Sequence, residues 1–212
     1  MRFDFSFVLT VVFLLLGPLK IIPVFAQLTQ GTDAAYRRRA ALFATLFATA
    51  VCAAIMLLAR TMVDSYRLSV EALQLTGGLI LLIWSLNAIF RHDDATPAPV
   101  TQPSPVRLAM APLTTPVIVT PAGVAALIIF VLLGPSVAGG QPAVAGALAL
   151  VMTLNFLVMA FNDRIVGLPW LVGLLQLLGS VLVVVQVAFA VQVILNGLVR
   201  IGAIGAIGGV AN

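Results

Sequence analysis

The stretch Phe5–Leu28 reads FSFVLTVVFLLLGPLKIIPVFAQL and carries one charge, Lys20, which stands between Pro18 and Pro23. At about 1.5 Å of helical rise per residue, this stretch is long enough to cross about 30 Å of hydrocarbon. The two prolines interrupt helical hydrogen bonds where no water replaces them. A charge at such a depth costs about 3 kcal/mol or more and usually faces a protein interior or a watery cavity. The stretch therefore predicts a broken transmembrane helix with a cation beside the break.

The composition of the whole chain agrees with that prediction. Hydrophobic residues make up 62% of the 212 residues and charged residues only 8%, whereas a soluble domain carries about 25% charged residues. We therefore expect an all-α integral membrane protein. The arginines lie at the ends of apolar spans and not in one patch, so nucleic acid is not an expected partner. A single cysteine and a single histidine predict no metal site and no cofactor.

Charges and turn residues divide the chain into six apolar spans. Loops after the first, third and fifth spans hold six arginines and the opposite side holds four, a bias that predicts both termini on the periplasmic side. We expect the first span to be retained and not cleaved as a signal peptide. The expected spans are residues 5–28, 40–59, 72–90, 108–133, 143–161 and 168–199.

An internal repeat relates the two halves of the chain. Gln74 in LQLTGG matches Gln176 in LQLLGS at an offset of 102 (176 minus 74), and Pro18 matches Pro112 at an offset of 94 (112 minus 18). Three spans per half imply two inverted three-helix repeats, with proline-broken helices 1 and 4. The alternative for the small residues in the matched segments is close helix packing alone. The expected units are residues 1–91, a Pro-rich linker 92–107, a second repeat 108–200 and a Gly-rich tail 201–212.

Several segments spread along the chain resemble the MarC family of bacterial inner-membrane proteins. The resemblance implies a six-helix protein of the bacterial inner membrane, similar to small exporters and to archaeal carriers of small neutral amino acids. The segments that carry it are GPLKIIPVF at 17–25, RRRAA at 37–41, TGGLILLI at 76–83, APLTTP at 111–116, TPAG at 120–123 and FAVQVILNGL at 189–198.

Lys20, with Pro18 and Pro23 beside it, is the leading candidate for a substrate-binding residue. Its ammonium could bind a substrate carboxylate or exchange a proton. The alternative is that the side chain extends to a nearby membrane interface, because only about 22 Å of helix precedes it. The sequence leaves both positions open.

Other polar residues complete the candidate site. Thr114, Thr115 and Thr120 lie among the prolines of the fourth span, where freed backbone groups can bind zwitterions; the alternative is that their hydroxyls only satisfy that backbone. Gln74 and Gln176 either bind a solute or bridge helices. No nucleophile–base pair or paired carboxylates lie in the spans, so an enzyme is not expected.

The sequence therefore favours a multi-pass membrane protein that acts as a secondary transporter or exporter of small neutral or zwitterionic solutes such as amino acids. The alternative is a non-transporting structural or stress-associated membrane protein. The expected partners are the lipid bilayer, a small solute and, as an open option, a second copy of the chain.

Overall fold

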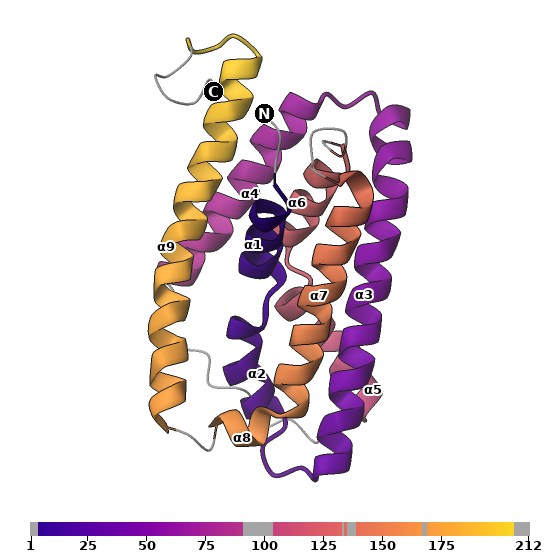
Figure 1. Cartoon of the computed structure of the whole chain (residues 1–212), viewed down its shortest axis with the longest axis vertical. Helices are drawn as coiled ribbons and strands as arrows, with labels where there is room; N and C mark the ends of the chain where they lie inside the picture. The colour runs from indigo at the N-terminus through magenta and orange to yellow at the C-terminus, as the bar shows by residue number, and fades with distance from the viewer. Residues whose placement is uncertain (1–3, 91–103, 133, 135–138, 167–168, 206–212) are drawn as a thin grey trace.

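The structure is a computed structural model that describes residues 4–90, 104–132, 134, 139–166 and 169–205. All regular secondary structure among these residues is helical. Five helical stretches are long and apolar enough to cross a membrane, and α6 is a shorter apolar helix. The helices form an elongated bundle in which α1 begins and α9 ends toward the same end (Figure 1). The five stretches are Phe5–Leu28, Ala34–Ser65, Val70–Asn87, Gly140–Ala160 and Leu177–Arg200.

The first span is divided into α1 (Phe5–Leu16), the short 3-10 helix η1 (Pro18–Lys20) and α2 (Ile21–Leu28). Gly17 joins α1 to η1 in an extended conformation, with φ −79° and ψ 171°. Proline disfavours the α conformation in the residue before it, which accounts for the break at this point. Glycine is needed because a Cβ atom here would lie 1.9 Å from the carbonyl oxygen of Phe13. Pro23 lies in the first turn of α2, where its missing N–H is tolerated.

The fourth expected span is divided into α5 (Pro105–Leu108), the π-helical segment η2 (Ala109–Ile118) and α6 (Pro121–Leu132). Inside η2, Ala111 and Thr115 adopt extended conformations, and each precedes a proline. Helix α5 begins inside the stretch expected to be a linker, because Ser104 caps it and Pro105 occupies its first position. The rest of that linker, residues 91–103, and the tail residues 206–212 lie outside the described residues.

The remaining helices surround these two broken segments. They are α3 (Ala34–Ser65), α4 (Val70–Phe90), α7 (Gly140–Ala160), the short α8 (Asn162–Val166) and α9 (Pro169–Arg200). Helix α4 packs most extensively on α9, while α3 packs on η2, α6 and α7. Figure 1 shows α1 and α2 between the α9 side and the α3 side of the bundle. The break in the first span therefore lies in the protein interior.

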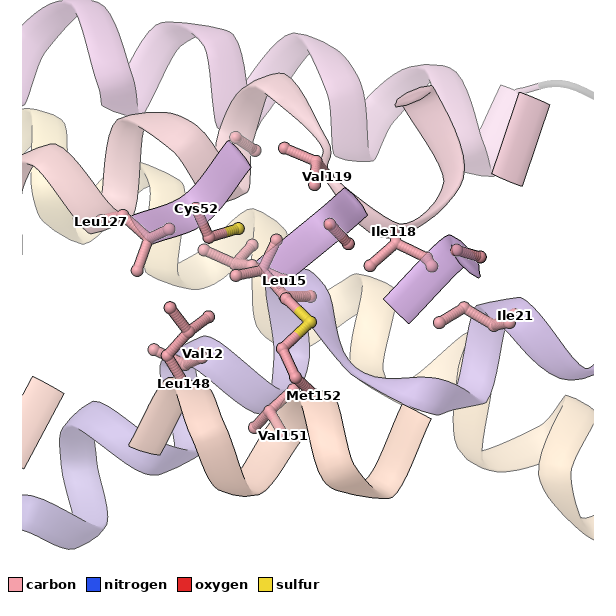
Figure 2. Close-up of a cluster of buried hydrophobic side chains, with 14 of the residues drawn as sticks. Val12, Leu15, Ile21, Cys52, Ile118, Val119, Leu127, Leu148, Val151 and Met152 are labelled. Atoms are coloured by element: carbon pink, nitrogen blue, oxygen red, sulfur yellow. The ribbon is translucent and has the colours of Figure 1, made fainter. Parts of the chain in front are cut away.

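The core and the outer surface are both apolar. Figure 2 shows Val12 and Leu15 of α1 facing Leu148 and Met152 of α7, and all four side chains are buried. Large hydrophobic side chains are also exposed on the outer faces of every long helix. Outward apolar faces of this extent are expected where lipid, and not water, is the solvent.

Candidate functional site

The break at Gly17 exposes three successive carbonyl groups, Leu14–Leu16, at the end of α1. Each accepts a hydrogen bond from a side chain of a distant segment: Gln186 Nε2 donates to Leu14 O at 2.5 Å, Thr120 Oγ1 to Leu15 O at 3.2 Å, and Asn155 Nδ2 to Leu16 O at 2.8 Å. The three donors come from α9, the start of α6 and α7. We call Leu14–Leu16 the carbonyl cluster. A buried carbonyl without a partner costs about 1–3 kcal/mol, so these bonds allow the helix to end inside the bundle.

Lys20 reaches the same carbonyl cluster from the other side of the break. Its Nζ donates to the carbonyl oxygen of Leu15, so this oxygen accepts from both Lys20 and Thr120. The last carbonyls of a helix carry a partial negative charge, which stabilises the ammonium there. Among the side chains that the structure describes, Lys20 forms no ion pair with a carboxylate.

The threonines of the fourth span are divided between two places. Thr120 is buried at the carbonyl cluster, and its Oγ1 also accepts from Gly123 N at 3.1 Å as the N-cap of α6. Thr114 is buried elsewhere: its hydroxyl donates to Ala109 O at 2.7 Å and lies 3.4 Å from Ala44 O on α3. Thr115 is exposed. The structure therefore brings Lys20 together with Thr120, and leaves Thr114 and Thr115 outside that group.

Gln74 lines a separate cavity of about 120 Å³. Its side chain is only 6% exposed, and its Oε1 has no hydrogen-bond partner among the described groups. Gln192 and Asn196 of α9 line the same cavity and bond to each other, Nε2 to Oδ1, at 3.2 Å. The side chain of Gln176 lies outside those that the structure describes. The rest of the lining is apolar and comes from α1, α4, α6 and α9, including Phe7, Phe130 and Phe189.

Two residues that bond to the carbonyl cluster, Asn155 and Gln186, are not among the binding residues predicted from the sequence. Asn155 is fully buried, and its Oδ1 has no hydrogen-bond partner among the described groups. Each of the two is an isolated amide in an apolar span, and this is the only sequence signal that distinguishes them. Their partners lie 139 and 172 residues away along the chain, so their role depends on tertiary structure.

The described residues contain no group of three His, Cys, Asp or Glu side chains that could hold a metal ion. Cys52 is buried within the apolar cluster of Figure 2. It packs there as a small hydrophobic side chain.

The comparisons with known proteins agree with the resemblance noted in the sequence. The model of the MarC family integral membrane proteins matches residues 3–201. The chain is 23% identical to the UPF0056 membrane protein MJ1677 of Methanocaldococcus jannaschii over 88% of this chain and 92% of that protein. It is 26% identical to the UPF0056 membrane protein YvbG of Bacillus subtilis over 86% of this chain and 92% of that protein. No solved structure matches the chain. With a family model matched over nearly its whole length and several apolar helices able to cross a membrane, this chain belongs to the MarC family of integral membrane proteins.

Proposed function

We propose that this protein is a secondary carrier or exporter of small neutral or zwitterionic solutes, amino acids among them, in the inner membrane. In this proposal the chain crosses the membrane six times with both termini in the periplasm, and α5–α6 forms the fourth crossing. The observation that carries the proposal is the position of Lys20. Its ammonium lies at a helix break in the bundle interior, where side chains from three other segments converge.

Lys20 can change partners because the carbonyl oxygen of Leu15 accepts two hydrogen bonds. Leu15 O accepts from both Lys20 and Thr120, so it keeps one donor if the lysine turns toward a solute carboxylate. Asn155 Oδ1, which has no partner among the described groups, is an acceptor for the ammonium group of the same solute. A zwitterion thus finds a donor for its anionic end and an acceptor for its cationic end near one break.

The geometry of the two breaks supports the proposed inverted repeat. Pro18 and Pro121 each begin a helical segment just after an extended stretch, and they are 103 residues apart (121 minus 18). That offset agrees with the 102 residues between Gln74 and Gln176 better than does the 94-residue offset to Pro112. Thr120 meets Leu15 across the two breaks, as expected for broken helices related by an axis in the membrane plane.

The same hydrogen bonds favour one second candidate, a non-transporting structural membrane protein. All three carbonyls of the cluster are already bonded within the protein, which is also what a purely structural helix break requires. A transport assay separates the two candidates.

The test is uptake and efflux of labelled small amino acids by liposomes that contain the purified protein. We expect Lys20→Met to abolish movement of the solute that the wild type carries, with the protein still folded in the membrane, because methionine keeps most of the apolar stem and removes the charge. Arg200→Met, at the exposed end of α9, is the matched control and should transport normally. Full transport by Lys20→Met would show that Lys20 does not bind the solute. A lack of transport by the wild type would favour the structural candidate.

A further inference from the structure

Three arginines surround a pocket at the end of the bundle where α3 begins and α7 ends (Figure 1). The pocket has a volume of about 140 Å³. Arg37 and Arg38 lie near the start of α3, and Arg164 comes from α8. The other lining residues are Ala34, Met159, Ala160 and Phe161. Two segments that are far apart in the sequence therefore present guanidinium groups to one small volume.

Local contacts hold two of these arginines in place. Arg37 donates from Nη1 to the carbonyl oxygen of Thr32 at 2.5 Å, and the Arg164 guanidinium lies 5.6 Å from the centre of the Phe161 ring, over its face. Two acidic residues lie next to this cluster in the chain. Asp33 caps α3 by accepting from Tyr36 N at 3.0 Å, and the side chain of Asp163 lies outside those that the structure describes. Like charges gathered at one site repel one another, and guanidinium groups match the oxygens of a phosphate in charge and geometry. The pocket is thus suited to a phosphate group.

Exposed leucines continue from the pocket along both helices. Leu42 and Leu46 follow Arg38 at intervals of four residues on α3, and they are 46% and 55% exposed. On α7, Leu157 lies four residues before the C-cap Phe161, and Leu150 lies seven residues before Leu157. Leu157 is 42% exposed and Leu150 is 44% exposed. Residues at such spacings lie on one face of a helix. Each helix therefore offers an apolar strip that leads away from the arginine pocket into the membrane, as the acyl chains of a lipid would run.

We propose that this pocket binds the phosphate headgroup of an anionic phospholipid, with the acyl chains along the exposed strips of α3 and α7. Basic pockets at helix ends beside lipid-facing surfaces are suited to such headgroups. The site is separate from Lys20 and does not depend on transport. A lipid bound there would hold the first residues of α3 against the turn between α7 and α8.

The test measures lipid binding to the purified protein in detergent, by native mass spectrometry and by thermal unfolding. The probes are phosphatidylglycerol and phosphatidylcholine with identical acyl chains. We expect phosphatidylglycerol to bind and raise the unfolding temperature, with little effect of phosphatidylcholine. The double variant Arg38→Gln, Arg164→Gln should bind phosphatidylglycerol at least about tenfold more weakly, because it loses charge-assisted hydrogen bonds to the phosphate. The control pair Arg60→Gln, Arg200→Gln removes the same charge elsewhere and should bind like the wild type.

Four results would overturn the proposal. Equal loss of binding in the control pair would show a general surface-charge effect, and equal binding of the two lipids would show that the phosphate charge selects nothing. An equal thermal shift with inorganic phosphate alone would assign the pocket to a free anion. If the double variant does not fold, the single variant Arg38→Gln is tested instead. It should fold because Arg38 is exposed and its replacement leaves the Arg164–Phe161 contact intact. Unchanged phosphatidylglycerol binding in that single variant would also overturn the proposal.

Discussion

The breaks in the first and fourth spans are stabilised in different ways. At the first break, the carbonyl cluster Leu14–Leu16 is bonded by side chains from three distant segments. At the second break, the hydrogen bonds of η2 are mostly local. Thr114 donates to Ala109 O at 2.7 Å, and Val119 N donates to Thr114 O at 2.8 Å. The first break, with Thr120 bonded to it, is thus a junction of the whole bundle, whereas the bonds of η2 before Thr120 are mostly local.

This difference indicates which break can rearrange more easily. The end of α1 cannot shift without loss of hydrogen bonds to α6, α7 and α9, and no water in the membrane replaces them. Segment η2 makes its two short bonds within itself and has one longer contact, 3.4 Å, from Thr114 to α3. Any movement that opens the bundle should therefore begin at η2 and leave the end of α1 in place.

The largest loss of stability should come from Gly17→Ala, because the substitution prevents the backbone conformation of the first break. The added Cβ would lie 1.9 Å from the carbonyl oxygen of Phe13, so the chain cannot keep the conformation that presents the carbonyl cluster. We expect a loss of stability on the order of 3 kcal/mol or more, measured by thermal unfolding in detergent. Gly146→Ala is the control, since a Cβ there meets no atom within 4 Å. Similar unfolding temperatures for the two variants would mean that the break does not require glycine.

A smaller loss is expected from Asn155→Leu, which removes the donor to Leu16 O and puts an apolar side chain of similar size in its place. The unpaired carbonyl should cost about 1–2 kcal/mol. Asn87→Leu, at an exposed position on α4, is the matched control and should change stability little. The measurement is again the unfolding temperature. An Asn155→Leu protein as stable as the control would show that the bonds from the other helices add little to the first break.

The smallest expected effect is the difference in stability loss between valine substitutions of the two buried threonines, Thr120 and Thr114. Thr120→Val removes both the bond to Leu15 O and the N-cap of α6, so we expect a loss of about 1–2 kcal/mol. Thr114→Val removes a mainly local bond and should cost less than about 1 kcal/mol. Comparing the two unfolding curves tests the contrast between the breaks. The reverse order of stability would show that η2 depends on the rest of the bundle as much as α1 does.

The membrane class, the family and five apolar spans could be read from the sequence, because composition and long apolar runs are strong signals. The position of the first break was also readable, since Pro18 lacks an N–H and constrains the residue before it. The form of the second break was not. Three prolines lie within ten residues there, and whether each one kinks, begins or extends a helix depends on packing against α3 and α7.

The partners at the candidate site were the least predictable part. We expected Lys20 to approach Thr114 and Thr115, but it shares a carbonyl with Thr120. The choice among three threonines within seven residues depends on the depth at which two antiparallel segments meet, and hydropathy does not specify that depth. Asn155 and Gln186 matter because of carbonyls that only become available when α1 ends. No pattern local to α7 or α9 encodes that event.

The contact between Thr120 and Leu15 also has an electrical consequence. It places the carboxyl end of α1 against the amino end of α6, and these ends carry partial charges of about −0.5 and +0.5 of an elementary charge. The positive end of α6 therefore offsets part of the negative charge at the end of α1. The ammonium of Lys20, which bonds to Leu15 O, adds a full positive charge at the break. In the carrier that we propose, this positive charge would repel a sodium or potassium ion, so a solute path at the break need not also conduct cations.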